Sequence, residues 1–109
     1  MSGRLLAIGD IHGCSVALNT LLDAIQPGAE DTVVTLGDYV DRGPDSRGVI
    51  DRLIALAQET KLVPLQGNHE QMMLDVLQGR APFQTWTPYG GIPTLNSFGF
   101  TGELCEPIF

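Results

Sequence analysis

The feature that most constrains this chain is a repeated local pattern, in which a short apolar run ends in glycine followed by an acidic or amide residue. The pattern occurs three times, at Gly9-Asp10, Gly37-Asp38 and Gly67-Asn68. The apolar runs that lead into these pairs are Arg4–Gly9, Thr32–Leu36 and Leu62–Leu65. Short apolar runs bounded by glycine are typical of buried strands. We therefore predict three strands, although Pro64 in the third run has no N–H to complete a sheet ladder.

Two amphipathic stretches separate the predicted strands. In Ser15–Ile25 the apolar residues recur at helical spacing, and Pro27-Gly28 follows as a helix stop. Ser46 can cap a second helix, whose apolar residues are Val49, Ile50, Leu53, Leu56 and Ala57. Alternating strands and helices are typical of a parallel sheet with right-handed crossovers. The predicted fold class is therefore α/β, with the order βαβαβ.

Beyond the third strand, the sequence predicts one further helix and then little regular structure. In His69–Leu77, the residues Met72, Met73, Val76 and Leu77 share one helical face. After Gly79 the pattern weakens, and residues 80–109 are expected to be loosely structured. A short helix at Thr94–Phe98 is the exception. The 109 residues are expected to form one domain at most.

Composition excludes several classes of function. A hydrophobic content of 43% fits a globular core. Six basic residues against thirteen acidic ones give a net charge of −7, which argues against a nucleic-acid-binding face. The sequence has no apolar run of about 18 residues, as a membrane span requires, and its start does not match a signal peptide. We expect a cytoplasmic protein that binds neither nucleic acid nor membrane.

The two cysteines, Cys14 and Cys105, are far apart and form no CxxC pair. A disulfide framework is therefore not expected. Cys14 lies beside the loops discussed next, and we interpret it as a small structural residue at a helix start rather than a reactive thiol.

The loops that follow the predicted strands carry the residues suited to chemistry. Their sequences are GDIHG (9–13), GDYVDRG (37–43) and GNHE (67–70). The carboxyl ends of parallel strands lie along one sheet edge, where ligands bind, so we expect these loops to converge. Carboxylate, amide and imidazole ligands suit a pair of divalent ions such as manganese, iron or zinc. Clustered carboxylates also repel each other, and a bound cation would remove that repulsion.

Each of these residues also has an ordinary structural interpretation. A single Asp after a strand usually forms a turn or caps a helix, and a lone loop histidine is usually solvated. However, both histidines of the chain, His12 and His69, lie in the loops. The combination favours a metal site over three independent turns. Glu70, at a helix start, is interpreted as structural, and Tyr39 and Trp86 as packing residues.

Together the three motifs resemble the signature motifs of the calcineurin-like metallophosphoesterases. The resemblance is strongest to the phosphoprotein-phosphatase branch, which includes serine/threonine protein phosphatases and diadenosine tetraphosphate hydrolases. The motifs lie within residues 9–70, and the later Gly90-Gly91 and Thr94-Leu95 resemble bacterial members more weakly. The resemblance implies that the chain forms the βαβαβ half of a layered α/β/β/α sandwich.

The resemblance implies a metal-binding role for four residues. Asp10 and His12 bind the first ion, Asp38 bridges both ions, and Asn68 binds the second through its carbonyl. The implied cofactors are two divalent metal ions, with manganese favoured over iron, zinc, nickel or magnesium. They would generate hydroxide at neutral pH for direct attack on phosphorus.

The resemblance also implies three catalytic residues. His69 is the general acid for the leaving oxygen, and Asp41 holds and polarises it. Arg42 binds the phosphoryl oxygens, for which a planar guanidinium is well suited. The residues implied to contact the substrate phosphate are Arg42, Asn68 and His69.

Members of this family complete the second metal site with two downstream histidines, and often add another phosphate-binding arginine. After His69 this sequence has no histidine, and its only arginine there is Arg80. We therefore expect the N-terminal part of a single metallophosphoesterase domain, with the C-terminal half missing. Such a chain alone should be a poor enzyme, and its uncovered sheet face should favour self-association.

Three functions remain open at this point. The first is a bacterial-type serine/threonine phosphoprotein phosphatase, acting on a phosphoprotein or a small phosphorylated substrate. The second is symmetrical hydrolysis of diadenosine tetraphosphate. The third belongs to another class and is an inactive, truncated fragment that binds one metal ion or none. A metal titration separates the third from the others, because an enzyme of this kind needs two ions per chain.

Overall fold

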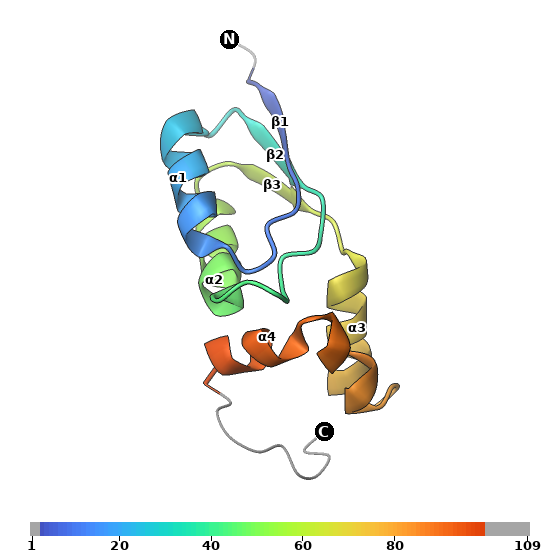
Figure 1. The fold of residues 1–109 in the computed structure, drawn as a ribbon. Helices are drawn as coiled ribbons and strands as arrows, with labels where there is room; N and C mark the ends of the chain where they lie inside the picture. Colours follow the sequence, from blue (N-terminus) through green and yellow to red (C-terminus); the bar gives the residue numbers. More distant parts are fainter. Residues whose placement is uncertain (1–2, 100–109) are drawn as a thin grey trace.

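The computed structural model describes residues 3–99 and contains a three-stranded parallel sheet with helices packed on it (Figure 1). The strands are β1 (Leu5–Ile8), β2 (Thr32–Thr35) and β3 (Lys61–Pro64). The helices are α1 (Ser15–Ile25), α2 (Ser46–Leu56), α3 (Asn68–Leu77) and α4 (Gly91–Ser97). The predicted alternation of strands and helices is confirmed. None of the helices between residues 3 and 99 is long and apolar enough to cross a membrane.

The central strand of the sheet is β2, with β1 and β3 parallel to it on either side. In this register Leu6 lies opposite Val33, and Val33 lies opposite Leu62. All three strands therefore end at the same edge, as the sequence predicts. Pro64 is accommodated because it is the last residue of an edge strand, where a missing N–H costs little.

The main core lies between one face of the sheet and the helices α1 and α2. Figure 1 shows both helices on the same side of the strands. The strands contribute the buried side chains of Ile8 and Val33. Helix α1 contributes Leu18 and Leu22, one turn apart on a single face, and α2 contributes Leu53. These buried residues determine which face of each strand and helix is turned toward the core.

A second, smaller core joins α3 to the segment that follows it. Its centre is the fully buried Trp86, which packs with Val76 of α3 and Leu95 of α4. Two 3-10 turns, Phe83–Thr85 and Thr87–Tyr89, connect the helices.

The expectation of a loosely structured segment at residues 80–109 is therefore wrong for residues 83–97. The short helix expected at Thr94–Phe98 is present, but it begins three residues earlier, at Gly91. Regular structure forms here because the apolar bodies of Trp86 and Leu95 are buried against α3, which outweighs the weak local signals. Residues 100–109, which include Cys105, lie outside the described residues.

A network around Asp31 ties the start of β1 to the loop before β2. The Arg4 guanidinium lies 2.9 Å from the Asp31 carboxylate, which also accepts hydrogen bonds from the backbone N–H of Arg4 (2.7 Å) and of Gly28 (2.8 Å). These donors, with the Arg4 side chain foremost, hold the pKa of Asp31 well below its usual range.

Candidate active site

The three motif loops touch one another at the carboxyl ends of the strands. The backbone N–H of His12 donates to the carbonyl of Asp38 at 3.0 Å, and that of His69 donates to Oδ1 of Asp38 at 3.1 Å. Glycines permit this approach. A Cβ on Gly67 would lie 2.3 Å from Oδ1 of Asp38, and one on Gly43 would lie 2.0 Å from the carbonyl oxygen of His12. The glycines of the motifs are thus required for the loops to meet.

Backbone strain is concentrated in two of these loops. The structure describes six non-glycine residues with positive φ, and one of them, Gln26, ends α1. The other five are motif residues: Asp10 (56°), His12 (40°), Asp38 (57°), Asp41 (76°) and Arg42 (72°). Each such residue costs about 1–3 kcal/mol and persists where the surroundings require it, typically at functional sites. The strained residues coincide with five of the seven predicted site residues.

His12 has one ring nitrogen committed to the protein. Its Nδ1 lies 3.0 Å from the carbonyl oxygen of Val40. A carbonyl only accepts hydrogen bonds, so Nδ1 carries the hydrogen and the lone pair lies on Nε2. A hydrogen bond of this kind orients metal-binding histidines and fixes their tautomer. His12 therefore meets the chemical requirement for a metal ligand through Nε2.

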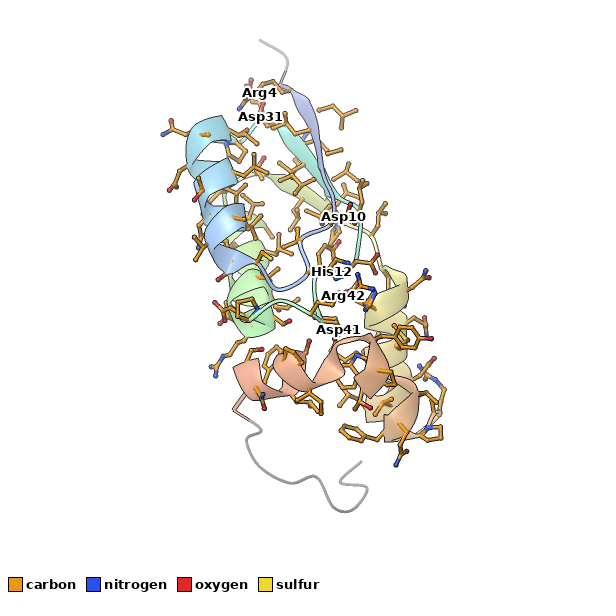
Figure 2. All side chains as sticks on the ribbon, viewed as in Figure 1. Arg4, Asp10, His12, Asp31, Asp41 and Arg42 are labelled. Atoms are coloured by element: carbon orange, nitrogen blue, oxygen red, sulfur yellow. The ribbon has the colours of Figure 1, made fainter. Side chains whose placement is uncertain are left out.

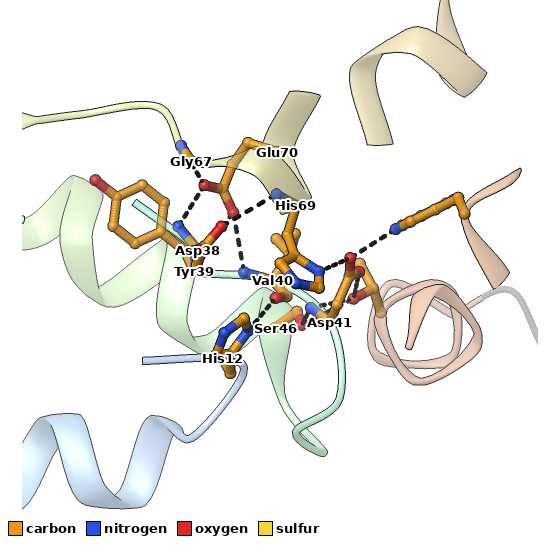
Figure 3. A network of polar contacts seen from close by, with 11 residues as sticks. His12, Asp38, Tyr39, Val40, Asp41, Ser46, Gly67, His69 and Glu70 are labelled. Carbon is orange, nitrogen blue, oxygen red and sulfur yellow. Dashed lines mark hydrogen bonds and ion pairs between the residues drawn. The ribbon is translucent and has the colours of Figure 1, made fainter. Parts of the chain in front are cut away.

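The loop that carries Asp38 is held by the buried carboxylate of Glu70 (Figure 3). One oxygen accepts from the N–H of Gly67 (2.9 Å) and of Asp38 (2.6 Å), and the other from the N–H of Tyr39 (2.8 Å) and of Val40 (3.3 Å). The structural role predicted for Glu70 is confirmed. It extends beyond its own helix, because Glu70 connects the second and third motif loops.

Asp41 and His69 form a buried pair (Figure 3). Oδ2 of the fully buried Asp41 lies 2.9 Å from Nδ1 of His69. A carboxylate directs the hydrogen of the neutral ring to Nδ1 and leaves Nε2 available. The His69 ring also packs edge-on against the His12 ring, with 4.7 Å between the ring centroids. The two histidines from distant motifs thus lie side by side.

The three remaining predicted residues, Asp10, Asn68 and Arg42, are exposed at the same end of the sheet. Figure 2 shows Asp10, His12, Asp41 and Arg42 in the region between the sheet and α4. Asn68 is the first residue of α3. The backbone N–H of Arg42 donates to the carbonyl of Gly90 at 3.1 Å, which ties the second motif loop to the start of α4.

The donor set can be compared with what a divalent ion requires. Asp10, His12, Asp38 and Asn68 supply carboxylate, imidazole and amide donors, a set that suits manganese, iron or zinc. Within residues 3–99, the part of the chain that the structure describes, no three His, Cys, Asp or Glu side chains lie close enough together to hold an ion. Binding therefore requires these loop side chains to turn toward the ion. The roles of these four residues as ligands stay predictions.

The structure also gives the positions of three side chains that the sequence analysis interpreted as structural. Tyr39 is buried, and its hydroxyl donates to the carbonyl of Leu65 at 2.6 Å. Trp86 is fully buried, but its indole N–H also donates to Asp41 Oδ2 at 2.7 Å, which packing alone did not predict. Cys14 is exposed and stands at the N-terminal boundary of α1.

Sequence reasoning missed the side chains that surround Asp41, namely Ser46, Trp86 and Thr94. The available signal was the weak resemblance at Gly90-Gly91 and Thr94-Leu95, which marks the segment but not its contacts.

The fold and these loops define the class of protein. The family model of the calcineurin-like phosphoesterases matches residues 3–107, so the chain belongs to this family. Calcineurin-like phosphoesterases depend on a dinuclear metal centre.

Individual relatives carry two different names. Over 87 residues the chain is 41% identical to serine/threonine-protein phosphatase 1 of Salmonella typhimurium, a match that covers 77% of this chain and 37% of the relative. It is 42% identical over 73 residues to a symmetrical bis(5′-nucleosyl)-tetraphosphatase of Ralstonia nicotianae, covering 67% of this chain and 25% of the relative. The matches thus span 25% to 37% of the length of these curated relatives.

A solved crystal structure supports the same fold. The protein is provisionally named a diadenosine tetraphosphatase and superposes with a TM-score of 0.51 at 30% sequence identity. The match covers 80% of this chain and 46% of that one. The prediction of a βαβαβ unit of the calcineurin-like fold is thereby confirmed.

Proposed function

We propose that this chain supplies the first-metal ligands and the proton donor of a phosphatase that hydrolyses phosphate monoesters on serine or threonine. The observation that carries the proposal is the arrangement of the two histidines. His12 and His69 lie edge to face, and each has Nδ1 engaged by an oxygen of the second motif loop. One free Nε2 suits an ion, and the other suits proton transfer to a neighbouring oxygen.

In the proposed site, Asp10, His12 and Asp38 would hold one ion, and Asp38 and Asn68 would contribute to a second. A divalent pair, for which we favour manganese, would neutralise charge and lower the pKa of water. Arg42 binds the phosphoryl oxygens by charge-assisted hydrogen bonds. Hydroxide derived from water bonds to phosphorus as the bond between phosphorus and the ester oxygen breaks, and His69, in its doubly protonated form, donates its Nε2 proton to the leaving oxygen. Asp41 keeps the ring oriented and stabilises its protonated form.

Symmetrical hydrolysis of diadenosine tetraphosphate is the second candidate, favoured by the names of the Ralstonia nicotianae relative and of the solved structure. We prefer the phosphoprotein phosphatase because the relative with that name matches more of this chain, 77% against 67%. The cytoplasmic location is part of the same proposal, and fractionation of cells would test it.

The test is hydrolysis by the purified protein with manganese, using p-nitrophenyl phosphate, a phosphoserine peptide and diadenosine tetraphosphate. Because the chain spans only part of its relatives' length, we expect slow phosphate release from the first two substrates and loss of that activity with EDTA. The Asp10→Asn variant should be inactive, whereas the exposed Asp23→Asn control should match the wild type. Preferential release of ADP from diadenosine tetraphosphate would favour the second candidate. If no substrate is hydrolysed, the inactive-fragment interpretation holds.

A further inference from the structure

We propose that Trp86 and Thr94 are positioning residues that hold the Asp41–His69 pair in its working geometry. With Ser46 they form a polar clamp around Asp41, and the name is used below for these three side chains. The inference rests on the proposed function only in taking His69 as the proton donor. The clamp itself is a statement about hydrogen bonds.

Asp41 is fully buried, and both of its carboxylate oxygens have hydrogen-bond partners. Its side chain has no exposed surface, so both oxygens must find their hydrogen-bond partners inside the protein. Oδ2 accepts from the Trp86 indole N–H at 2.7 Å, beside the bond to His69 at 2.9 Å. Oδ1 accepts from the Thr94 hydroxyl at 2.7 Å. Because both oxygens are held, the carboxylate cannot rotate away from His69 without losing a partner.

The directions of these bonds follow from the chemistry of the groups. Asp41 Oδ1 can only accept when ionised, so the Thr94 hydroxyl must donate to it. The single hydroxyl hydrogen of Thr94 is then used, and Ser46 must be the donor in their 3.1 Å contact. The backbone N–H of Asp41 in turn donates to Thr94 Oγ1 at 2.7 Å. The clamp is thus a directed chain from Ser46 through Thr94 to Asp41.

The packing of α3 and α4 holds Trp86 and Thr94 in place. The Trp86 ring packs between Val76 of α3 and Leu95 of α4. A Cβ on Gly91 would lie 2.6 Å from this ring, so α4 lies directly against the indole. Thr94 is one turn further along α4 and is 1% exposed. The packed segment that carries Trp86 and Thr94 therefore places one hydrogen-bond donor at each oxygen of the Asp41 carboxylate.

The clamp determines how the ring of His69 is oriented. This orientation depends on Oδ2 of Asp41, which also accepts the hydrogen bond of Trp86. Loss of the hydrogen-bond partner of a metal-binding histidine typically lowers metal affinity or activity about 10–100-fold, and we expect an effect on this scale when Asp41 loses a donor. Residues 83–97 therefore serve as the support of the proton donor, although no residue of the segment needs to touch the substrate.

The test is NMR spectroscopy of the chain labelled with 15N in histidine and tryptophan, which contains only two imidazoles and one indole. In the wild type, we expect the indole proton of Trp86 and the Nδ1 proton of His69 to exchange slowly. We also expect a nuclear Overhauser contact between them, because both point at one oxygen. A rapidly exchanging indole proton without that contact would overturn the clamp, with no variant needed.

Variants then assign the effect to individual donors. Thr94→Val removes one donor at nearly constant shape, and Trp86→Phe removes the other together with part of a buried ring. Each should speed exchange of the His69 proton at least about tenfold. Thr94→Ser keeps the hydroxyl and should restore slow exchange. Thr20→Val, which removes an exposed hydroxyl of α1, is the matched control. The His12 proton, bonded to Val40, should change in none of them.

Unchanged exchange at His69 in folded Thr94→Val and Trp86→Phe chains would refute the positioning role. The measurement needs neither metal nor substrate, so a failure of the proposed phosphatase activity leaves its outcome intact. If the protein hydrolyses phosphate esters, the same variants should lower kcat more than they raise KM.

Discussion

At the scale of single residues, the site depends on which atoms are left over after the protein has satisfied its own hydrogen bonds. His69 gives Nδ1 to Asp41 and keeps Nε2, as His12 does with Val40. The two rings differ in their partners, a buried carboxylate for one and a backbone carbonyl for the other. A carboxylate stabilises a positively charged ring far more than a carbonyl does, which suits His69 to proton donation and His12 to metal binding.

Replacing His69 by Asn should lower kcat strongly without loss of metal. General acid catalysis contributes about 10²–10⁴-fold, and a substrate whose leaving group needs a proton should show this loss. The loss should be smaller for p-nitrophenyl phosphate than for phenyl phosphate, because p-nitrophenolate leaves without protonation. Steady-state kinetics on both substrates, with metal content measured in parallel, checks this. Equal losses on the two substrates would count against proton donation by His69.

The candidate site residues in the loops could be predicted from sequence, because Asp, His and Arg side chains suited to metal or phosphate binding occur within a few residues of each strand end. The surroundings of Asp41 could not. The Trp86 and Thr94 donors lie 45 and 53 residues away in the chain, and their hydrogen bonds exist only once α4 is packed. Local pattern carries no information about such partners.

At the scale of elements, the loop after β2 is held by the start of α3. The four backbone N–H groups that donate to Glu70 include those of three successive loop residues. Glu70→Gln replaces an acceptor oxygen by a donor amide that faces N–H groups. We expect a loss of about 2 kcal/mol or more, since these are buried hydrogen bonds to a charged group. The unfolding temperature should fall by roughly 8–16 °C.

Thermal unfolding followed by circular dichroism measures this change. The matched control is Glu30→Gln, which makes the same substitution at an exposed position and should leave the unfolding temperature unchanged. If Glu70→Gln unfolds at the wild-type temperature, Glu70 does not hold the loop.

The network of Asp31 predicts a pH-dependent contribution to stability. Its pKa is lowered in the folded state, so the ionised carboxylate stabilises the fold above the unfolded-state pKa of about 4. The contribution is lost as the pH falls below that value toward the lower folded-state pKa. Asp31→Asn should therefore reduce the urea midpoint at pH 7, and the difference from wild type should shrink in acid. A difference that is constant with pH would contradict the role of the Arg4–Asp31 pair.

The strands and the first three helices were predictable because short apolar runs and 3.6-residue patterns are local and strong. Of residues 83–97 only the short helix near Thr94 was predicted, because glycine and proline weaken the local signal of the segment. Gly90 and Gly91 are needed there for close approach, to the backbone of Arg42 and to the ring of Trp86. Residues that usually mark loops thus serve packing, which only the folded structure reveals.

At the scale of the whole molecule, one face of the sheet is covered by α1 and α2, and the other carries exposed apolar side chains. Leu5 is 77% exposed and Val63 is 44% exposed. We predict that the chain self-associates through this face, in line with the expectation from sequence. Light scattering should show association that weakens in the Leu5→Lys/Val63→Lys variant. The control Ile54→Lys alters an equally exposed residue of α2 and should associate like the wild type.

We propose that three loops at one sheet edge form a divalent-metal site, and calorimetric titration with manganese tests this proposal. The wild-type chain and the Asp23→Asn control should bind at least one ion per chain. Asp38→Asn should bind none, because the residue common to both proposed ion positions has lost its charge. If Asp38→Asn binds manganese with wild-type affinity and stoichiometry, the site is not where these loops place it.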